Sequence, residues 1–447
     1  MKKILREKYI QKATAILLTA VMVLSVFAVL PADLFKASAA TNVNFDDRLE
    51  LDFNNNWKFH LGNDSKAYLK SFDDSSWDSV ELPHDFSISQ NFFSDGVEAE
   101  SGNLPGGIGW YRKTFVMSSD ARDKSVILNF DGSYKDTYVY VNGKLVGENH
   151  YGYNSFSFDI TDYLVYDGKT ANIIAVKVEN QLPSSRWYSG SGIYRDVTMT
   201  IVDPVHVALY GTQITTPNLE SSNGSDGTVN VAVTLDNDNS YDQVVNVVTQ
   251  ILDATGAPVG TSAQTEVTSR HSGQTTVTLT PTLANPNLWN SWDLGTPYLY
   301  TIRTTVSENG KVIDTYDTEF GYRWFDWDAD GGFSLNGHNL KLEGVCMHHD
   351  QGVLGAVQEY DSIYRQVMIL KDMGCNAIRT SHGTPSDVFM DICNELGMLV
   401  MDEFFDGWDT AKNDNSNDFS VYFDEEIDVN ELKTPVFKVF EYLEGIK

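Results

Sequence analysis

The sequence predicts three successive domains: a β-sandwich or jelly roll, an immunoglobulin-like β-sandwich, and the start of a parallel α/β domain. Its 447 residues exceed the roughly 100–200 residues of a typical single domain. Between Thr41 and about Thr318, short apolar runs are separated by turn residues, which is typical of β-sandwiches. Beyond about Gly321, strand-like and helix-like segments alternate instead, and this pattern favours a parallel sheet.

Residues 1–39 have the features of a secretory signal peptide. Lys2, Lys3 and Arg6 begin a basic segment. An apolar run extends from Ala13 to Leu30, and Ala37-Ser38-Ala39 provides an A-x-A cleavage site. We therefore expect a secreted, extracellular protein with no stable membrane insertion after cleavage. The alternative is an uncleaved anchor helix, because the apolar run approaches the roughly 18–20 residues that span a bilayer.

The composition excludes several classes of partner. The chain has 62 Asp and Glu against 32 Lys and Arg, and this formal net charge of −30 repels nucleic acids and anionic lipid surfaces. We expect no nucleic-acid partner. Cys346, Cys375 and Cys393 are too few for a disulfide framework and lack the spacing of a zinc site, so we expect them to be small buried side chains.

The first β domain is predicted over residues 40–203. Its clearest strands are Ser125–Phe130, Asp136–Val141 and Asn172–Glu179, the last with apolar residues at every second position. Asn142-Gly143 directly follows one of these strands, and Asn-Gly between apolar runs is the strongest short hairpin signal. Many short strands with such turns indicate a sandwich or jelly roll.

The second β domain is predicted over residues 204–318. Val229–Leu235 and Tyr298–Arg303 alternate between apolar and polar residues, and Ser221–Gly227 is a polar loop. About seven such strands fit this length, which is typical of an immunoglobulin-like sandwich.

A third domain is predicted over residues 319–424, where a strand and helix pattern repeats. The expected strands are Leu340–Val345, Ala377–Arg379 and Leu399–Asp402. Apolar residues at helical spacing mark the two helices between them, ended by Gly374 and Gly397. Since a (β/α)8 barrel needs about 250 residues, we expect at most three or four βα units, followed by a divergent tail at 425–447.

Polar side chains follow all three predicted parallel strands. They are His348, His349 and Asp350 after the first, Arg379 and His382 at the second, and Asp402, Glu403 and Asp406 after the third. The carboxyl ends of parallel strands meet at one rim, where barrel enzymes place their active sites. Such donors and acceptors, with Trp408 nearby, suit a polyhydroxylated substrate. A metal site is the alternative, but no His-x-His or i, i+4 His pair supports it.

Several motifs resemble those of glycoside hydrolase family 2, and most closely its β-galactosidases. In the third domain these motifs are Gly344–Asp350, Asn376–Pro385 (NAIRTSHGTP) and Met398–Trp408. Those similar to the family's sugar-binding jelly roll are Pro83–Phe86, Gly109–Lys113, Phe130–Gly132 and Arg186–Asp196. Those similar to its immunoglobulin-like domain are Asn285–Trp289 and Tyr298–Tyr300. The resemblance extends from about Phe45 to Asp424, in the family's domain order.

The resemblance implies a jelly roll, an immunoglobulin-like sandwich and an incomplete (β/α)8 TIM barrel. It also implies a retaining hydrolase that acts on the O-glycosyl bonds of β-galactosides, with no cofactor and no bound metal. By position, it assigns substrate contacts to His348, Arg379, His382, Asp402, Glu403, Asp406, Asp85 and Arg186.

The resemblance does not supply catalytic residues in this chain. A retaining glycosidase needs two carboxyl groups about 5–5.5 Å apart, and the family's acid/base and nucleophile glutamates lie on later barrel strands. Asn394-Glu395 is an Asn-Glu pair like the one that carries the family's acid/base glutamate. It falls inside a predicted helix, however, so we expect an exposed helical glutamate there. We interpret the chain as a truncated form that is inactive alone.

Other functions and substrates stay open at this stage. One alternative is a non-catalytic carbohydrate-binding protein, and another is an adhesin built of β-sandwiches. The rim residues of the third domain argue against an adhesin, which needs no such rim. Within the family, a β-glucuronide or a β-mannoside is the alternative substrate, and the sequence leaves open a homo-oligomer.

Overall fold

The computed structural model describes residues 47–93, 99–271 and 273–406, together with Ala411, Asn417 and Ser420. The predicted signal peptide, Trp408 and the predicted tail lie outside these residues. Of the helices within them, none has the length and apolar character needed to cross a membrane.

The first domain is a sandwich of two antiparallel sheets. One has the strand order β1-β10-β5-β8 and the other β3-β2-β4-β9-β6-β7. The strands are β1 (Leu49–Asp52), β2 (Trp57–Leu61), β3 (Asp78–Val80), β4 (Gly107–Val116), β5 (Ser125–Phe130), β6 (Asp136–Val141), β7 (Lys144–Asn149), β8 (Phe156–Asp159), β9 (Ala171–Asn180) and β10 (Val197–Val202). Side chains that alternate inward along both sheets, such as Leu128, Val139 and Val176, form one core between them.

The Asn142-Gly143 turn connects β6 to β7 as predicted. Both residues have positive φ, 51° for Asn142 and 86° for Gly143. A two-residue turn with positive φ at both positions matches the twist of the strands that it joins. The three strands predicted in this domain are confirmed to within one residue.

The second domain is also a sandwich of two antiparallel sheets, with strand orders β11-β13-β16 and β12-β17-β15-β14-β18-β19. The strands are β11 (Val205–Thr215), β12 (Asp226–Thr228), β13 (Asn230–Asn237), β14 (Gln243–Leu252), β15 (Pro258–Ser269), β16 (Thr275–Leu279), β17 (Thr282–Ala284), β18 (Tyr300–Glu308) and β19 (Lys311–Phe320). Val233, Val247 and Ile302 are among the buried residues between its sheets.

The third domain begins with a small antiparallel sheet that the sequence did not predict. This sheet contains β20 (Phe325–Asp328), β21 (Gly332–Leu335) and β22 (His338–Asn339). A parallel sheet follows, in the order β23 (Gly344–Met347), β24 (Ala377–Thr380) and β25 (Leu399–Met401). Its first strand begins four residues later than predicted, and Leu340 and Leu342 instead join an apolar cluster that contains Trp289 of the second domain and Leu399 of the third.

Helices α2 (Tyr360–Asp372) and α3 (Asp387–Leu396) connect these parallel strands. Ser386 caps α3 by accepting a hydrogen bond from the Phe389 N–H, and Gly397 ends that helix in the left-handed conformation. Ile363 and Val367 of α2 share one core with Phe389 and the sheet. Both predicted helices are therefore confirmed.

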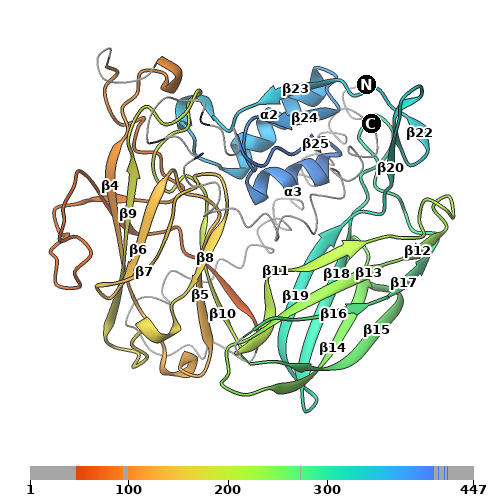
Figure 1. Ribbon diagram of the computed structural model, residues 1–447, viewed down its shortest axis with the longest axis horizontal. Helices are drawn as coiled ribbons and strands as arrows, with labels where there is room; N and C mark the ends of the chain where they lie inside the picture. The colour runs from red at the N-terminus through yellow and green to blue at the C-terminus, as the bar shows by residue number, and fades with distance from the viewer. Residues whose placement is uncertain are drawn as a thin grey trace, which may run out of the picture.

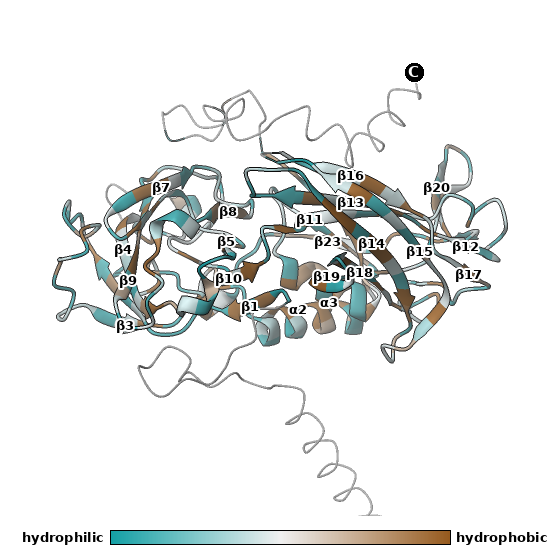
Figure 2. Ribbon diagram, turned by 90° about the horizontal axis from the view of Figure 1, so that it is seen from below, coloured by the Kyte–Doolittle hydropathy of each residue, from teal (hydrophilic) through white to brown (hydrophobic). Residues whose placement is uncertain are grey.

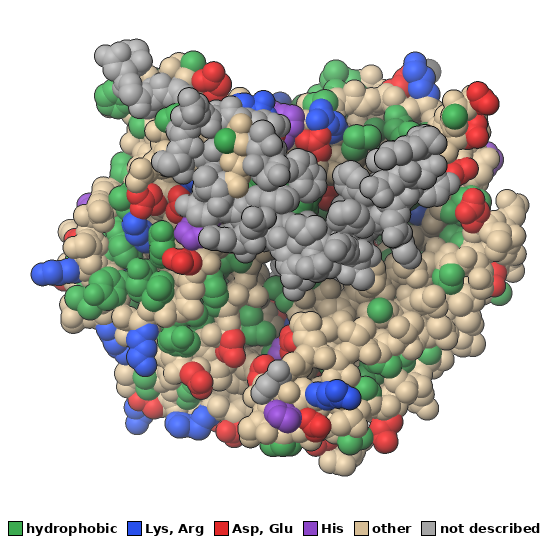
Figure 3. Space-filling view, in the orientation of Figure 1, with side chains coloured by type: hydrophobic (Ala, Val, Ile, Leu, Met, Phe, Trp, Pro, Cys, Tyr) green, Lys and Arg blue, Asp and Glu red, His purple; other side chains and the backbone are tan. Residues whose placement is uncertain are grey.

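The parallel unit lies between the two sandwiches. Figure 1 shows it at the top of the molecule, with the jelly roll to the left and the second sandwich to the lower right. Figure 2 shows α2 and α3 side by side at the lower edge of the molecule, between the two β domains. On the face shown in Figure 3, acidic and basic side chains are interspersed over the surface.

The prediction of three buried cysteines is correct only in part. Cys393 is buried in α3, Cys375 is partly buried, and Cys346 is exposed. Cys346 lies on β23, an edge strand of the described parallel sheet. An apolar run in a strand therefore did not imply burial on both faces.

Candidate functional site

The C-terminal ends of the three parallel strands form one rim. His348 follows β23, His382 follows β24, and Asp402 and Glu403 follow β25. Strands in register place these positions next to each other: Met347 pairs with Thr380, and Arg379 pairs with Met401. The rim predicted from the sequence is therefore present in the fold.

Three rings form one wall of this rim. Trp187 reaches in from the jelly roll, and its ring centroid lies 5.3 Å from that of His348 and 5.1 Å from that of His382. The two imidazoles are 5.7 Å apart. Burial, and then the proximity of His382, lower the pKa of His348. At neutral pH this wall therefore includes an uncharged imidazole that can donate or accept a hydrogen bond.

Glu403 is the centre of the polar network at the rim. Its carboxylate pairs with the Arg379 guanidinium and lies 3.0 Å from Nδ1 of His382. Thr380 Oγ1 accepts a hydrogen bond from the Glu403 N–H at 3.0 Å. Arg379 also contacts the Cys346 sulfur at 3.3 Å. These contacts fix the carboxylate of Glu403 between one cation and one imidazole.

Asp402 is the second carboxyl group at the end of β25. Thr380 Oγ1 donates to its Oδ1 at 3.4 Å. Although part of the residue is exposed, desolvation raises the pKa of its carboxyl group to about 6. Asp402 and Glu403 therefore stand in different environments, since, among the described residues, only Glu403 has a cationic partner in direct contact.

Arg186 and Asp406 join the jelly roll to the rim. Arg186 Nη2 lies 2.9 and 2.8 Å from the two carboxylate oxygens of Asp406. Tyr151 of the jelly roll donates to the Phe404 carbonyl at 2.9 Å, and its ring stacks on Phe405 at 4.6 Å. The segment after β25 is thus held against the first domain.

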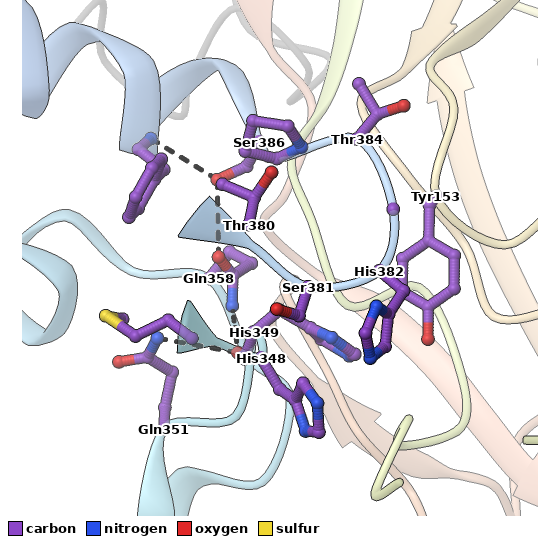
Figure 4. Close-up of a pocket in the computed structure, with 14 residues that line it drawn as sticks. Tyr153, His348, His349, Gln351, Gln358, Thr380, Ser381, His382, Thr384 and Ser386 are labelled. Carbon is purple, nitrogen blue, oxygen red and sulfur yellow. Dashed lines mark hydrogen bonds between the residues drawn. The ribbon is translucent and has the colours of Figure 1, made fainter. Parts of the chain in front are cut away.

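A small cavity of about 30 Å³ lies beneath the rim, with room for roughly one or two water molecules. Figure 4 shows His348, His349 and His382 at this cavity, together with Tyr153 from the jelly roll. His349 Nε2 donates to the Ser189 carbonyl at 3.0 Å, which fixes its tautomer, and burial lowers its pKa to about 3. His349 is therefore a neutral residue that connects the two domains.

Asp85 does not line the rim, and its predicted contact with substrate needs correction. The residue is 1% exposed. Its carboxylate accepts hydrogen bonds from the N–H groups of Ser87, Ser191 and Ala356, and from the hydroxyls of Ser87 and Tyr188. A buried carboxylate with this many donors positions the surrounding loops and does not reach a solute above them.

Three further residues at the junction were missed as individual site candidates. Trp187 and Arg195 lie inside the Arg186–Asp196 motif, which resembles the family's jelly roll. Tyr153 lies in the loop after β7, and no sequence pattern marks it as a site residue. Arg195 is 1% exposed and donates to the carbonyls of Thr384 and Tyr153, at 2.7 and 3.1 Å. The sequence signal for Arg195 was its place within a run of positions that become buried. A buried arginine needs hydrogen-bond partners elsewhere in the fold to offset the cost of burying its charge.

Within the described residues, no three His, Cys, Asp or Glu side chains come together in a way that could hold a metal ion. The expectation of a site without metal stays a prediction.

Three family models match consecutive parts of the chain. Residues 52–203 match the sugar binding domain of glycosyl hydrolases family 2, residues 206–323 match the model described as glycosyl hydrolases family 2, and residues 329–433 match the family 2 TIM barrel domain. The order and approximate bounds of these matches agree with the three domains of the structure.

Curated relatives and solved structures give the same grouping. Beta-galactosidase BoGH2A of Bacteroides ovatus is 41% identical over 391 residues, which cover 86% of this chain and 44% of that protein. A putative beta-glucuronidase of Formosa agariphila is 39% identical, with 81% and 33% covered. The structure of a family 2 member from Bacteroides cellulosilyticus matches with a TM-score of 0.79 and 37% identity, covering 84% of this chain and 48% of that one. The chain thus spans less than half the length of these relatives.

Proposed function

The chain belongs to glycosyl hydrolase family 2, and from this premise we propose that the whole protein hydrolyses β-galactosides with retention of configuration. The family fold and its glycosidase relatives are the starting point. The substrate, the stereochemistry and the roles of individual residues are the proposal.

The observation that carries this proposal is the composition of the rim. A sugar ring has hydroxyl groups around its edge and apolar C–H faces, so its site needs donors and acceptors beside an aromatic surface. Trp187 is 5% exposed and packs against His348 and His382, so these three rings together form the aromatic wall of the rim. Arg379, Asp402 and Glu403 supply the polar groups, and Arg186 with Asp406 closes one side.

We assign sugar binding, rather than bond cleavage, to Glu403 and Asp406 at this rim. Glu403 is paired with Arg379, and Asp406 is paired with Arg186. Such pairing suits an acceptor for sugar hydroxyls, and Asp402 alone does not supply the two carboxyl groups that a retaining glycosidase needs. Residues 40–447 alone are therefore expected to bind the sugar without cleaving it.

The test is hydrolysis of p-nitrophenyl β-D-galactopyranoside by purified residues 40–447. We expect no turnover above a buffer control, together with saturable binding of methyl β-D-galactopyranoside that is weakened in His382→Ala. Turnover that is lost in Glu403→Gln but kept in Glu395→Gln would overturn the assignment. Glu395 is the matched control because it is an exposed glutamate on α3, where it accepts a hydrogen bond from the Tyr360 hydroxyl.

A non-catalytic carbohydrate-binding protein is the second candidate. The pairing of Glu403 with Arg379 and of Asp406 with Arg186 favours it for residues 40–447. The substrate alternatives are β-glucuronides and β-mannosides, and the relatives include proteins named for β-glucuronide hydrolysis. Comparing the binding of methyl β-D-galactoside, β-D-glucuronide and β-D-mannoside distinguishes them, and preference for either of the last two would overturn the galactoside assignment.

Secretion also forms part of the proposal. It is based on the basic start, the apolar run and the A-x-A site of residues 1–39. The protein recovered from the culture medium should begin at Ala40. A cell-bound chain that begins at Met1 would contradict this.

A further inference from the structure

A second cleft lies between the immunoglobulin-like sandwich and helix α3. It has a volume of about 320 Å³, within the range of roughly 300–1,000 Å³ that small-molecule sites occupy. Its polar and aromatic lining includes Thr215, Thr216, Trp289, Glu319, Arg323 and Asn394, and we call it the interdomain cleft. Figure 1 shows α3 next to the ends of β11 and β19, which carry part of this lining.

This cleft is separate from the rim. Asn394 is in the last turn of α3, just before Gly397 and the start of β25. Because α3 runs back against the parallel strands, its last turn lies at their N-terminal ends, whereas the rim lies at their C-terminal ends. The Trp292 indole confirms this placement, since it donates to the carbonyl of Cys375, just before β24 begins.

The wall of the interdomain cleft is rigid. The Trp289 indole donates to the Asn394 carbonyl at 2.8 Å, and the Trp289 N–H donates to the Tyr322 carbonyl at 2.8 Å. Trp289 is 2% exposed, and a Cβ added at Gly321 would lie 2.6 Å from it. The Arg323 guanidinium stacks on this fixed indole, 4.8 Å from the ring centroid.

The polar groups of the cleft have spare hydrogen-bonding capacity. Arg323 and Glu319 are both exposed to solvent, and neither side chain makes a hydrogen bond or ion pair to another described residue. The carboxamide of Asn394 and the hydroxyl of Thr215 likewise make no hydrogen bond to a described residue. Arg323 and Glu319 line the same cleft without pairing, so donors and acceptors both remain open to a ligand.

The charges around the cleft select the class of ligand. Burial raises the pKa of Glu319, and the nearby Asp391 and Glu395 raise it further. Three acidic groups oppose an anion, and Arg323 opposes a cation. The lining is also too polar for an apolar ligand. A neutral molecule with many hydroxyl groups satisfies the open donors and acceptors without a charge conflict.

We propose that the interdomain cleft is a second carbohydrate-binding site, which takes one or two neutral sugar rings at the opposite end of the parallel strands from the rim. Arg323 and Asn394 donate to the sugar hydroxyls, and Glu319 and Thr215 accept from them. The site is independent of hydrolysis at the rim and can hold a saccharide while the rim is empty.

The test is a lactose titration of residues 40–447 labelled with ¹⁵N-arginine. The Nε–H signal of Arg323, assigned by its loss in Arg323→Lys, is expected to shift along a saturable curve in the wild-type protein and in His382→Ala. Arg323→Ala should weaken calorimetric binding at this site by about tenfold or more, the effect of losing a hydrogen bond from a charged group. Glu319→Gln, which keeps the shape, should weaken it less.

Arg270→Ala is the matched control, because Arg270 is an exposed arginine of the same domain that does not line the cleft. Binding that responds equally to Arg270→Ala and Arg323→Ala would overturn the proposal. So would an Arg323 signal that moves with phosphate and ignores lactose, which would make the cleft an anion site. If only His382→Ala abolishes lactose binding, the rim is the sole site and the interdomain cleft is not a sugar site. If only Arg323→Ala abolishes it, the interdomain cleft binds the sugar and the rim proposal fails.

Discussion

The carboxylate of Asp85 accepts hydrogen bonds from two domains at once. The Ser191 N–H of the jelly roll donates to it at 3.0 Å, and the Ala356 N–H of the parallel unit donates at 2.9 Å. Because Ser191 belongs to the same loop as Arg186 and Trp187, Asp85 positions residues that line the rim without reaching the rim itself.

We expect Asp85→Asn to lower the free energy of unfolding by about 2–3 kcal/mol. The amide has a similar size, but its NH₂ group would face donors that need an acceptor. Urea unfolding measures the effect, with Asp123→Asn as the control, since Asp123 is an exposed residue of a turn. Equal stability of the two variants would contradict the positioning role.

Asp131 makes stability depend on pH. Its side chain is 16% exposed and lies 3.9 Å from Arg195. Burial raises its pKa from the ordinary 3.8 to about 6, even though Arg195 opposes the change. Between these two values the folded protein holds a proton that the unfolded chain has released. This contribution to stability is therefore complete below about pH 4 and is lost as pH rises through about 6.

Asp131→Asn is expected to be more stable than the wild type at pH 7.5, by up to about 3 kcal/mol, because one pKa unit corresponds to about 1.4 kcal/mol. At pH 4.5 the difference should shrink. The measurement is the urea midpoint of both proteins across this pH range. A difference that does not change with pH would show that Asp131 is not the titrating group.

At the scale of the element, helices α2 and α3 end in the same way but in different surroundings. Gly374 follows α2 with φ 93°, and an added Cβ would meet nothing within 4 Å. Gly397 follows α3 with φ 71°, and an added Cβ would lie 2.7 Å from the backbone nitrogen of Trp292. The second helix is therefore fitted against the loop of another domain.

Gly374→Ala should cost about 1 kcal/mol, the penalty of a left-handed conformation for a residue with a Cβ. Gly397→Ala should cost more, about 2–4 kcal/mol, because the backbone at Trp292 also has to move. Thermal and urea unfolding of this matched pair test the difference. The same cost at both positions would mean that the contact with Trp292 is not tight.

Local patterns predicted most of these elements because their causes are local. Alternation at β13, the Asn142-Gly143 turn and the glycines that end α2 and α3 each depend on a few neighbouring residues. The three strand ends predicted the rim for the same reason. Burial of Asp85 could not be predicted, because it depends on Ala356, which is 271 residues away. The exposure of Cys346 depends on what covers one face of β23, which a strand pattern does not reveal.

At the scale of the whole molecule, Arg195 couples the jelly roll to the parallel unit. It is fully buried and donates to carbonyls of both domains, among them Asp131 and Tyr153 in the first and Thr384 in the third. Trp289 and Trp292 make the corresponding connections from the second domain, to Asn394 and Cys375.

Arg195→Met should uncouple the segment 381–386 from the jelly roll. The carbonyl of Thr384 would lose its hydrogen-bond donor, whereas the methionine side chain would fill nearly the same volume as the arginine. We expect faster hydrogen exchange and proteolysis in and after this segment, with little change in β13 and β14 of the second domain. Arg303→Met is the control, since the Arg303 side chain forms an exposed pair with Asp317 on the neighbouring strand of the same sheet. Protection at 381–386 equal to that of the control would contradict the coupling.

The pair between Arg186 and Asp406 joins positions 220 residues apart in the chain. A ribosome that adds 5–20 residues per second needs roughly 10–45 s to travel from one to the other. The jelly roll is complete long before that, so the surface that carries Trp187 and Arg186 is already formed when the last rim residues emerge. The last rim residues can thus fold against a jelly-roll surface that has already formed, and the two halves of the rim form in the order in which the chain is made.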